Sequence, residues 1–162
     1  MTRRLIWLYL LSTLAWAAPA WKDFRSGEGT FRGVFPTAPK ASQSQTNTPL
    51  GQVATKVYSS SNSKGNYAIA CTELPGAAVK FAADKVISDA KAGVLKDANA
   101  TEINWSEVNG GHELTYRSAQ SVGWCQIFLV GDRLYVLDAR MRSGTSRTDW
   151  VLPFFARFSP QN

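Results

Sequence analysis

The chain has 162 residues and a formal net charge of +6, from 18 lysines and arginines against 12 aspartates and glutamates. The basic residues are scattered, so the sequence lacks the clustered positive charge expected of a protein that binds nucleic acid. With one histidine and two cysteines, the chain also lacks the usual ligand set of a zinc site, and we predict neither a metal nor another cofactor.

The first 20 residues have the organisation of a cleavable secretory signal. A start with two arginines is followed by an apolar run over residues 5–11 and then by small residues. A membrane anchor would need roughly 20 apolar residues, whereas Ser12 interrupts this run early. We therefore expect export to the periplasm or the medium, with cleavage after Ala20 or after Ala17 and no stable membrane insertion afterwards.

Cleavage after Ala20 would leave residues 21–162, a length typical of one domain. It would also remove the two arginines, which leaves 16 basic and 12 acidic side chains and a net charge of +4. The mature chain is thus only mildly basic.

Alternation of apolar and polar residues predicts strands in the first half of this domain. Residues 30–35 alternate, and residues 52–58 and 66–72 alternate again. Residues 36–51 are polar and contain turn-forming residues, so this stretch is interpreted as a connection.

After Gly76 the apolar period changes from two to about 3.6, which predicts the longest helix of the chain. Its apolar stripe consists of Val79, Ala82, Ala83, Val86, Ala90 and Val94. Gly93 lies near the expected end of the helix.

The dipeptide Asn109-Gly110 predicts a two-residue type I′ hairpin turn. Counted outward from this turn, the register gives the pairs Glu107–His112, Trp105–Leu114 and Ile103–Tyr116. This register collects apolar residues on one face of the hairpin and polar residues on the other, as a one-sided sheet requires.

A second hairpin is predicted around Gly131, between strands over residues 122–130 and 133–139. These strands are apolar on both faces, which is typical of the middle of a covered sheet. A short aromatic helix follows near Phe154, with Pro153 in its first turn. The order of elements predicts an α+β fold in which an antiparallel β-sheet is flanked by helices on both faces.

His112 is the only histidine, and the hairpin register places it opposite Glu107, where a cross-strand pair explains both residues. We therefore predict no catalytic residue. The alternative is a hydrolase that uses His112, Glu107 or Asp138 in an unrecognised arrangement.

Cys71 and Cys125 fall on predicted strands with apolar neighbours. If the two strands are neighbours, an oxidising compartment favours one disulfide between them, and if they are separated, two buried thiols remain. Trp21 lies outside the periodic segments, which makes it the candidate for an exposed aromatic residue that binds a ligand.

The N-terminal spacing of aromatic, glycine and proline residues resembles that of exported bacterial proteins of the PsbP-like group, including DcrB-type and LpqN-type envelope proteins. The residues that carry it are Trp21, Phe24, Ser26, Glu28, Gly29, Phe31, Phe35, Pro36 and Pro39, followed by Gly51, Tyr67, Leu74-Pro75, residues 111–113 and Arg133-Leu134-Tyr135. The resemblance implies a PsbP-like sandwich with a binding or accessory role, and it carries over no catalytic residue.

The sequence thus predicts an exported, non-catalytic domain of the bacterial cell envelope. Its partner would be an unidentified envelope protein or a small ligand. Besides the hydrolase, a structural envelope protein that acts through self-association is an alternative, for which a large exposed apolar patch would be the sign.

Overall fold

The computed structural model describes residues 20–48 and 51–161, so the predicted signal segment lies, except for Ala20, outside the described residues. Strands make up 53% of the structure. The strands are β1 (Lys22–Arg25), β2 (Phe31–Phe35), β3 (Lys40–Thr48), β4 (Gly51–Ser61), β5 (Gly65–Glu73), β6 (Thr101–Val108), β7 (Gly111–Arg117), β8 (Ser121–Val130), β9 (Arg133–Arg142) and β10 (Ser159–Pro160). The helices are α1 (Gly76–Ala98), α2 (Arg147–Trp150) and α3 (Leu152–Ala156).

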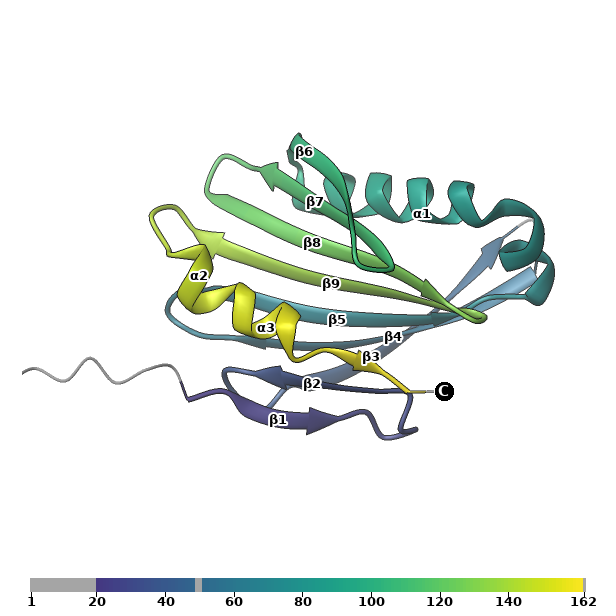
Figure 1. Cartoon of the computed structure of the whole chain (residues 1–162), viewed down its shortest axis with the longest axis horizontal. Coiled ribbons are helices and arrows are strands. Elements are labelled where there is room, and N and C mark those ends of the chain that lie inside the picture. Colours follow the sequence, from purple (N-terminus) through teal and green to yellow (C-terminus); the bar gives the residue numbers. More distant parts are fainter. Residues whose placement is uncertain (1–19, 49–50, 162) are drawn as a thin grey trace, which may run out of the picture.

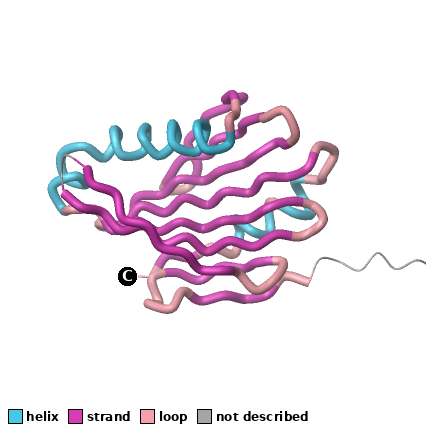
Figure 2. The backbone as a smooth tube through the Cα atoms, turned by 180° about the vertical axis from the view of Figure 1, so that it is seen from behind, coloured by secondary structure: helices cyan, strands magenta, loops and turns pink. Residues whose placement is uncertain are grey.

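Two antiparallel sheets organise these strands. The larger has seven strands in the order β3-β4-β5-β9-β8-β7-β6, and the smaller has three in the order β1-β2-β10. One face of the large sheet carries α1, and the small sheet with α2 and α3 lies against the other face (Figures 1 and 2). The predicted α+β class with helices on both faces is therefore wrong, because a second sheet packs on the face away from α1 and the chain is mainly β.

The large sheet separates two apolar layers. The layer toward the small sheet is mostly aromatic, with Phe31, Phe35, Tyr67, Tyr135 and Phe154 all at most 1% exposed. The layer toward α1 is mostly aliphatic and packs Val94 of the helix on Leu114 and Ile127 of the sheet. The prediction that the strands around Gly131 lie in the middle of a sheet covered on both faces is confirmed, since β9 is the central strand and β8 is next to it.

Helix α1 ends where the sequence allows a left-handed residue. Asn99 has φ 46° and ψ 55°, and its backbone N–H reaches the carbonyls of Leu95 and Lys96. Near its start the helix is kinked at Ala82, whose φ of −143° is not helical. Among the described residues, no helix is long and apolar enough to cross a membrane.

The hairpin at Asn109-Gly110 forms with the predicted register from Asn104 to Thr115. Beyond that point a β-bulge shifts the pairing, so that Glu102 and not Ile103 faces Tyr116. Ile103 is consequently 53% exposed and does not join the apolar face where the unbroken register placed it.

Strand β3 was not predicted. Its residues are polar, and the prolines on either side of it indicated a connection. In the structure, residues 40–48 pair with residues 51–59 of β4 along their whole length, and β3 is an edge strand of the large sheet.

Candidate functional site

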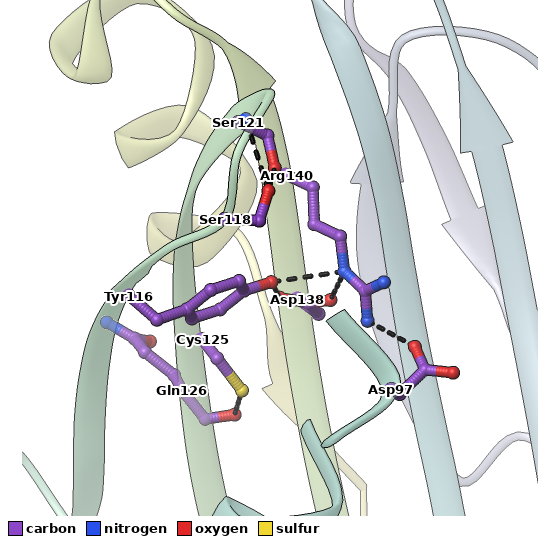
Figure 3. Close-up of polar contacts among 8 residues, drawn as sticks. All are labelled: Asp97, Tyr116, Ser118, Ser121, Cys125, Gln126, Asp138 and Arg140. Atoms are coloured by element: carbon purple, nitrogen blue, oxygen red, sulfur yellow. Dashed lines mark hydrogen bonds and ion pairs between the residues drawn. The ribbon is translucent and has the colours of Figure 1, made fainter. Parts of the chain in front are cut away.

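A chain of polar side chains crosses the α1 face of the large sheet (Figure 3). The hydroxyl of Tyr116 donates to Oδ1 of Asp138 at 2.6 Å, and Nε of Arg140 donates to Oδ2 of the same carboxylate at 2.7 Å. Nε of Arg140 also lies 3.1 Å from the Tyr116 hydroxyl oxygen. Its Nη2 donates to Oδ2 of Asp97 at 2.6 Å. We call these four residues the Asp138 array.

The strand ladder brings the array together. Asp138 and Arg140 are two residues apart on β9 and therefore share a face. Tyr116 on β7 reaches them across β8, because the residue between them in the ladder is Gly123. A Cβ atom at this glycine would lie 2.0 Å from Cζ of Tyr116, so only glycine leaves room for the ring. Asp97 comes from the last turn of α1.

Burial controls the electrostatics of the array. Asp138 is 7% exposed, and burial raises the pKa of its carboxyl above the ordinary value, while Arg140 and Tyr116 act in the opposite direction. Burial and the neighbouring Asp138 raise the pKa of the Tyr116 hydroxyl. Burial lowers the pKa of the Arg140 guanidinium, but Asp138 and Asp97 outweigh it and hold the pKa above the ordinary value.

A cavity of about 480 Å³ opens beside the array. Asp138, Arg140 and Asp97 form one wall of it. The remaining lining comes from the β2–β3 loop and from β3, β4 and β5: Thr37, Ala38, Lys40, Ser59, Ser60, Ser61, Asn66, Tyr67 and Ala68. In Figure 2, α1 crosses only part of this face of the large sheet.

Several lining residues occupy two cross-strand rows of the sheet. Asn66 pairs with Arg140 and with Ser61, and Ala68 pairs with Asp138 and with Ser59. The cavity therefore offers hydroxyl and amide groups next to a half-buried guanidinium. Nη1 of Arg140 makes no hydrogen bond with any described residue, so it remains available to an acceptor on a ligand.

Of the three residues weighed for a hydrolase, the structure brings only Glu107 and His112 together, as the predicted cross-strand pair. Asp138 belongs to the separate array described above. The His112 ring stacks on Trp105 with centroids 4.7 Å apart and planes 8° apart. Nζ of Lys91 lies 4.8 Å from the Trp105 centroid.

His112 also lines a smaller cavity of about 220 Å³ together with Asp84 and Ser88. Its Nδ1 is buried and has no hydrogen-bond partner, and no hydrogen bond joins these three residues in the part of the chain that the structure describes. Within residues 20–48 and 51–161, no group of three or more His, Cys, Asp or Glu side chains could hold a metal ion.

Trp21 is half-buried and not an exposed aromatic. Its ring meets Tyr67 edge-on with centroids 5.4 Å apart and lies 6.4 Å from Trp150. It therefore extends the aromatic layer between the two sheets.

Cys71 and Cys125 are both free thiols, so the disulfide left open by the sequence is not formed. Strand β9 lies between β5 and β8, which puts their backbones about 10 Å apart, beyond the span of a disulfide. The two thiols also lie in different layers, Cys71 toward the small sheet and Cys125 toward α1. Burial raises the pKa of both thiols.

The sequence alone does not predict the array, although it contains one signal. Asp138 and Arg140 are charged residues at alternating positions of a segment, residues 134–141, that is otherwise apolar on both faces. Charged groups in such a strand must find partners. The sequence does not identify the partners Tyr116 and Asp97, however, because strand pairing brings Tyr116 to the array and the position of the end of α1 brings Asp97 there.

The fold is similar to that of solved structures with low sequence identity. The solution structure of cyanobacterial PsbP (CyanoP) from Synechocystis sp. PCC 6803 has a TM-score of 0.55 and 14% identity, over 94% of this chain and 99% of that chain. A crystal structure from Bacteroides thetaiotaomicron VPI-5482 has a TM-score of 0.49 and 12% identity, over 87% of this chain and 48% of that chain. No protein-family model and no curated protein sequence matches.

The chain thus has a PsbP-like fold, which confirms this part of the resemblance seen in the sequence. The narrower grouping with DcrB-type and LpqN-type envelope proteins stays a prediction.

Proposed function

We propose that this protein is an exported, non-catalytic accessory domain that binds a small polar ligand in the cavity beside the Asp138 array. The observation that carries the proposal is the position of Arg140. Its Nε and Nη2 are fixed by Asp138 and Asp97 at 2.7 and 2.6 Å, which leaves Nη1 free of described partners at the cavity wall. A guanidinium held in this way is preorganised to receive an acceptor oxygen of a ligand.

The state of the array supports binding over catalysis. Each oxygen of the Asp138 carboxylate accepts a hydrogen bond from a fixed donor, and the Tyr116 proton is directed at that carboxylate. A general base needs a free acceptor within reach of a substrate proton. The hydrolase alternative would require His112 to be hydrogen-bonded to Ser88 or Asp84, and no such bond is found among the described residues.

Export is supported by the order of charged, apolar and small residues over positions 1–20. Mass spectrometry of the protein from its native host tests this part of the proposal. We expect an N-terminus at Trp21 or at Ala18. A mature protein that retains Met1 would contradict export by this signal.

Ligand binding is tested by ligand-observed NMR with a library of organic acids, amino acids and sugars. Ser59 is exposed and lines the cavity, so Ser59→Phe should block it without touching the array. Ser143→Phe is the matched control, because Ser143 is exposed and does not line the cavity. Compounds that bind the wild type should lose their signal with Ser59→Phe and keep it with Ser143→Phe. Compounds that bind all three equally would place the ligand elsewhere.

A further inference from the structure

Three arginines surround a cavity on the small sheet, away from the Asp138 array. Arg25 on β1 and Arg32 on β2 are directly opposite each other in the antiparallel ladder, so their side chains leave the same face. Ser159 on β10 faces Arg32 from the other side. Arg157 lines the same cavity, which has a volume of about 640 Å³.

This arrangement is unfavourable for the protein alone. Like charges directly opposite each other destabilise a strand pair. The side chains of Arg25, Arg32 and Arg157 make no hydrogen bond or ion pair with any described residue. Other arginines of the described residues do pair with carboxylates, as Arg140 does with Asp138 and Asp97, and as Arg147 does with Glu113.

The cavity has the chemistry of an anion site. Its lining includes three guanidinium groups against one carboxylate, that of Asp23, which leaves a net charge of +2. Val34, on the same face as Arg32 and 1% exposed, gives the site a buried apolar floor. A Cβ at Gly29 would lie 3.3 Å from Nη2 of Arg25, so that guanidinium rests against the β1–β2 turn.

We propose that this cavity binds a phosphate group. A phosphate monoester carries a charge between about −1.5 and −2 at pH 7, which matches the net charge of the lining. Guanidinium groups donate paired N–H bonds to phosphate oxygens, and a tetrahedral phosphate has enough oxygens to engage more than one arginine. The phosphate could belong to a soluble molecule or to a lipid headgroup. The proposal concerns a different sheet from the polar-ligand cavity and does not depend on that function.

The test is a titration of the full mature chain with inorganic phosphate at constant ionic strength, followed by the backbone amide signals in NMR. We expect saturable shifts at the residues that line the cavity. The double variant Arg25→Gln/Arg32→Gln should bind at least about tenfold more weakly, because it removes charged hydrogen bonds. The control Arg117→Gln/Arg142→Gln removes the same charge from exposed positions outside the cavity and should bind as the wild type does.

Two further arms define the anion and its source. Succinate, a dianion with carboxylates, should bind more weakly than phosphate, and equal binding would overturn the assignment to phosphate. Vesicles of phosphatidylcholine with phosphatidic acid, whose headgroup is a phosphate monoester, should retain the wild type and release the Arg25/Arg32 variant if the source is a lipid headgroup, whereas binding of free phosphate alone identifies a soluble phosphate. Both results support the site. Absence of saturable shifts, or equal loss in the control pair, would overturn it.

Discussion

The hydroxyl of Tyr116 donates to Oδ1 of Asp138 at 2.6 Å across the width of β8. Both residues are buried, and Tyr116 is 0% exposed. The aromatic layer on the opposite face holds a contrasting residue, because the buried hydroxyl of Tyr67 has no hydrogen-bond partner in the described chain.

The two tyrosines predict opposite outcomes for the same substitution. Tyr116→Phe leaves the buried Asp138 carboxylate one donor short and should lower the free energy of unfolding by about 1–3 kcal/mol. Tyr67→Phe removes an unpaired buried hydroxyl and should leave the stability unchanged or raise it. Urea unfolding of both variants checks this pair, and an equal loss in the two would contradict the importance of the array.

Two glycines form a second matched pair. Gly123→Ala places a Cβ atom 2.0 Å from the Tyr116 ring, so we expect a loss of about 3 kcal/mol or more from overpacking. Gly93 lies inside α1, with no atom within 4 Å of an added Cβ, and Gly93→Ala should therefore stabilise by about 0.5–1 kcal/mol. Thermal unfolding separates the two effects. A tolerated Gly123→Ala would mean that Tyr116 has another position available.

The Asp138 carboxyl predicts a pH dependence. Its pKa in the folded protein is raised above the ordinary 3.8, mainly by burial. As the pH rises from 3.8 toward the raised value, the native state keeps a proton that the unfolded state has released. The contribution of this group to stability therefore falls with rising pH, by up to about 1.4 kcal/mol per pH unit.

Unfolding free energies at several pH values above 3.8, for the wild type and Asp138→Asn, check this. The stability of the wild type relative to the variant should fall as the pH rises. Asp132→Asn, which changes an exposed carboxylate outside the array, is the control. A difference between wild type and Asp138→Asn that stays constant over the range is the contrary outcome.

Because Arg25 and Arg32 lie directly opposite each other, we expect Arg32 to lower the stability of the protein when no phosphate is bound. In phosphate-free buffer of low salt, Arg32→Thr should raise the free energy of unfolding by about 0.2–1 kcal/mol, because it removes a like charge directly opposite Arg25. Arg142→Thr makes the same change at an exposed position of β9 and should lack this gain. Added phosphate should stabilise the wild type more than Arg32→Thr, since only the intact site binds it well.

Both cysteines should be free thiols in the purified protein. Denatured protein that has never been reduced should contain two free thiols by titration with Ellman's reagent. The native protein should react slowly at both positions, because Cys71 is 8% and Cys125 is 0% exposed and burial raises their pKa. Fewer than two thiols would show that a disulfide forms.

Local patterns in the sequence predicted the elements whose signals are strong. Examples are the Asn109-Gly110 turn, the helix after Gly76 and the doubly apolar strand before Gly131. Strand β3 escaped this reasoning because its residues neither alternate nor bury apolar groups, and its pairing with β4 decides its conformation. The exposure of Ile103 was not predicted, because the β-bulge moves its side chain to the other face of the sheet and no feature of the neighbouring sequence indicates a bulge.

The two candidate sites could not be predicted from local sequence patterns, because they are formed by contacts between residues that the tertiary structure brings together. Asp97 and Arg140 are 43 residues apart and meet only because α1 ends above β9. Arg25 and Arg32 meet because the short β1–β2 connection sets their register. The charged residues were visible in the sequence, but which of them found partners was decided by the tertiary structure.

Because the cysteine thiols lie on opposite faces of the large sheet, no covalent bond has to form for the chain to reach its native state. An oxidising enzyme is therefore not needed for folding, and residues 21–162 made in a reducing cytoplasm should reach the same structure as chains that fold in an oxidising compartment. This makes bacterial cytoplasmic expression of residues 21–162, without refolding, a sound source of material for the titrations above.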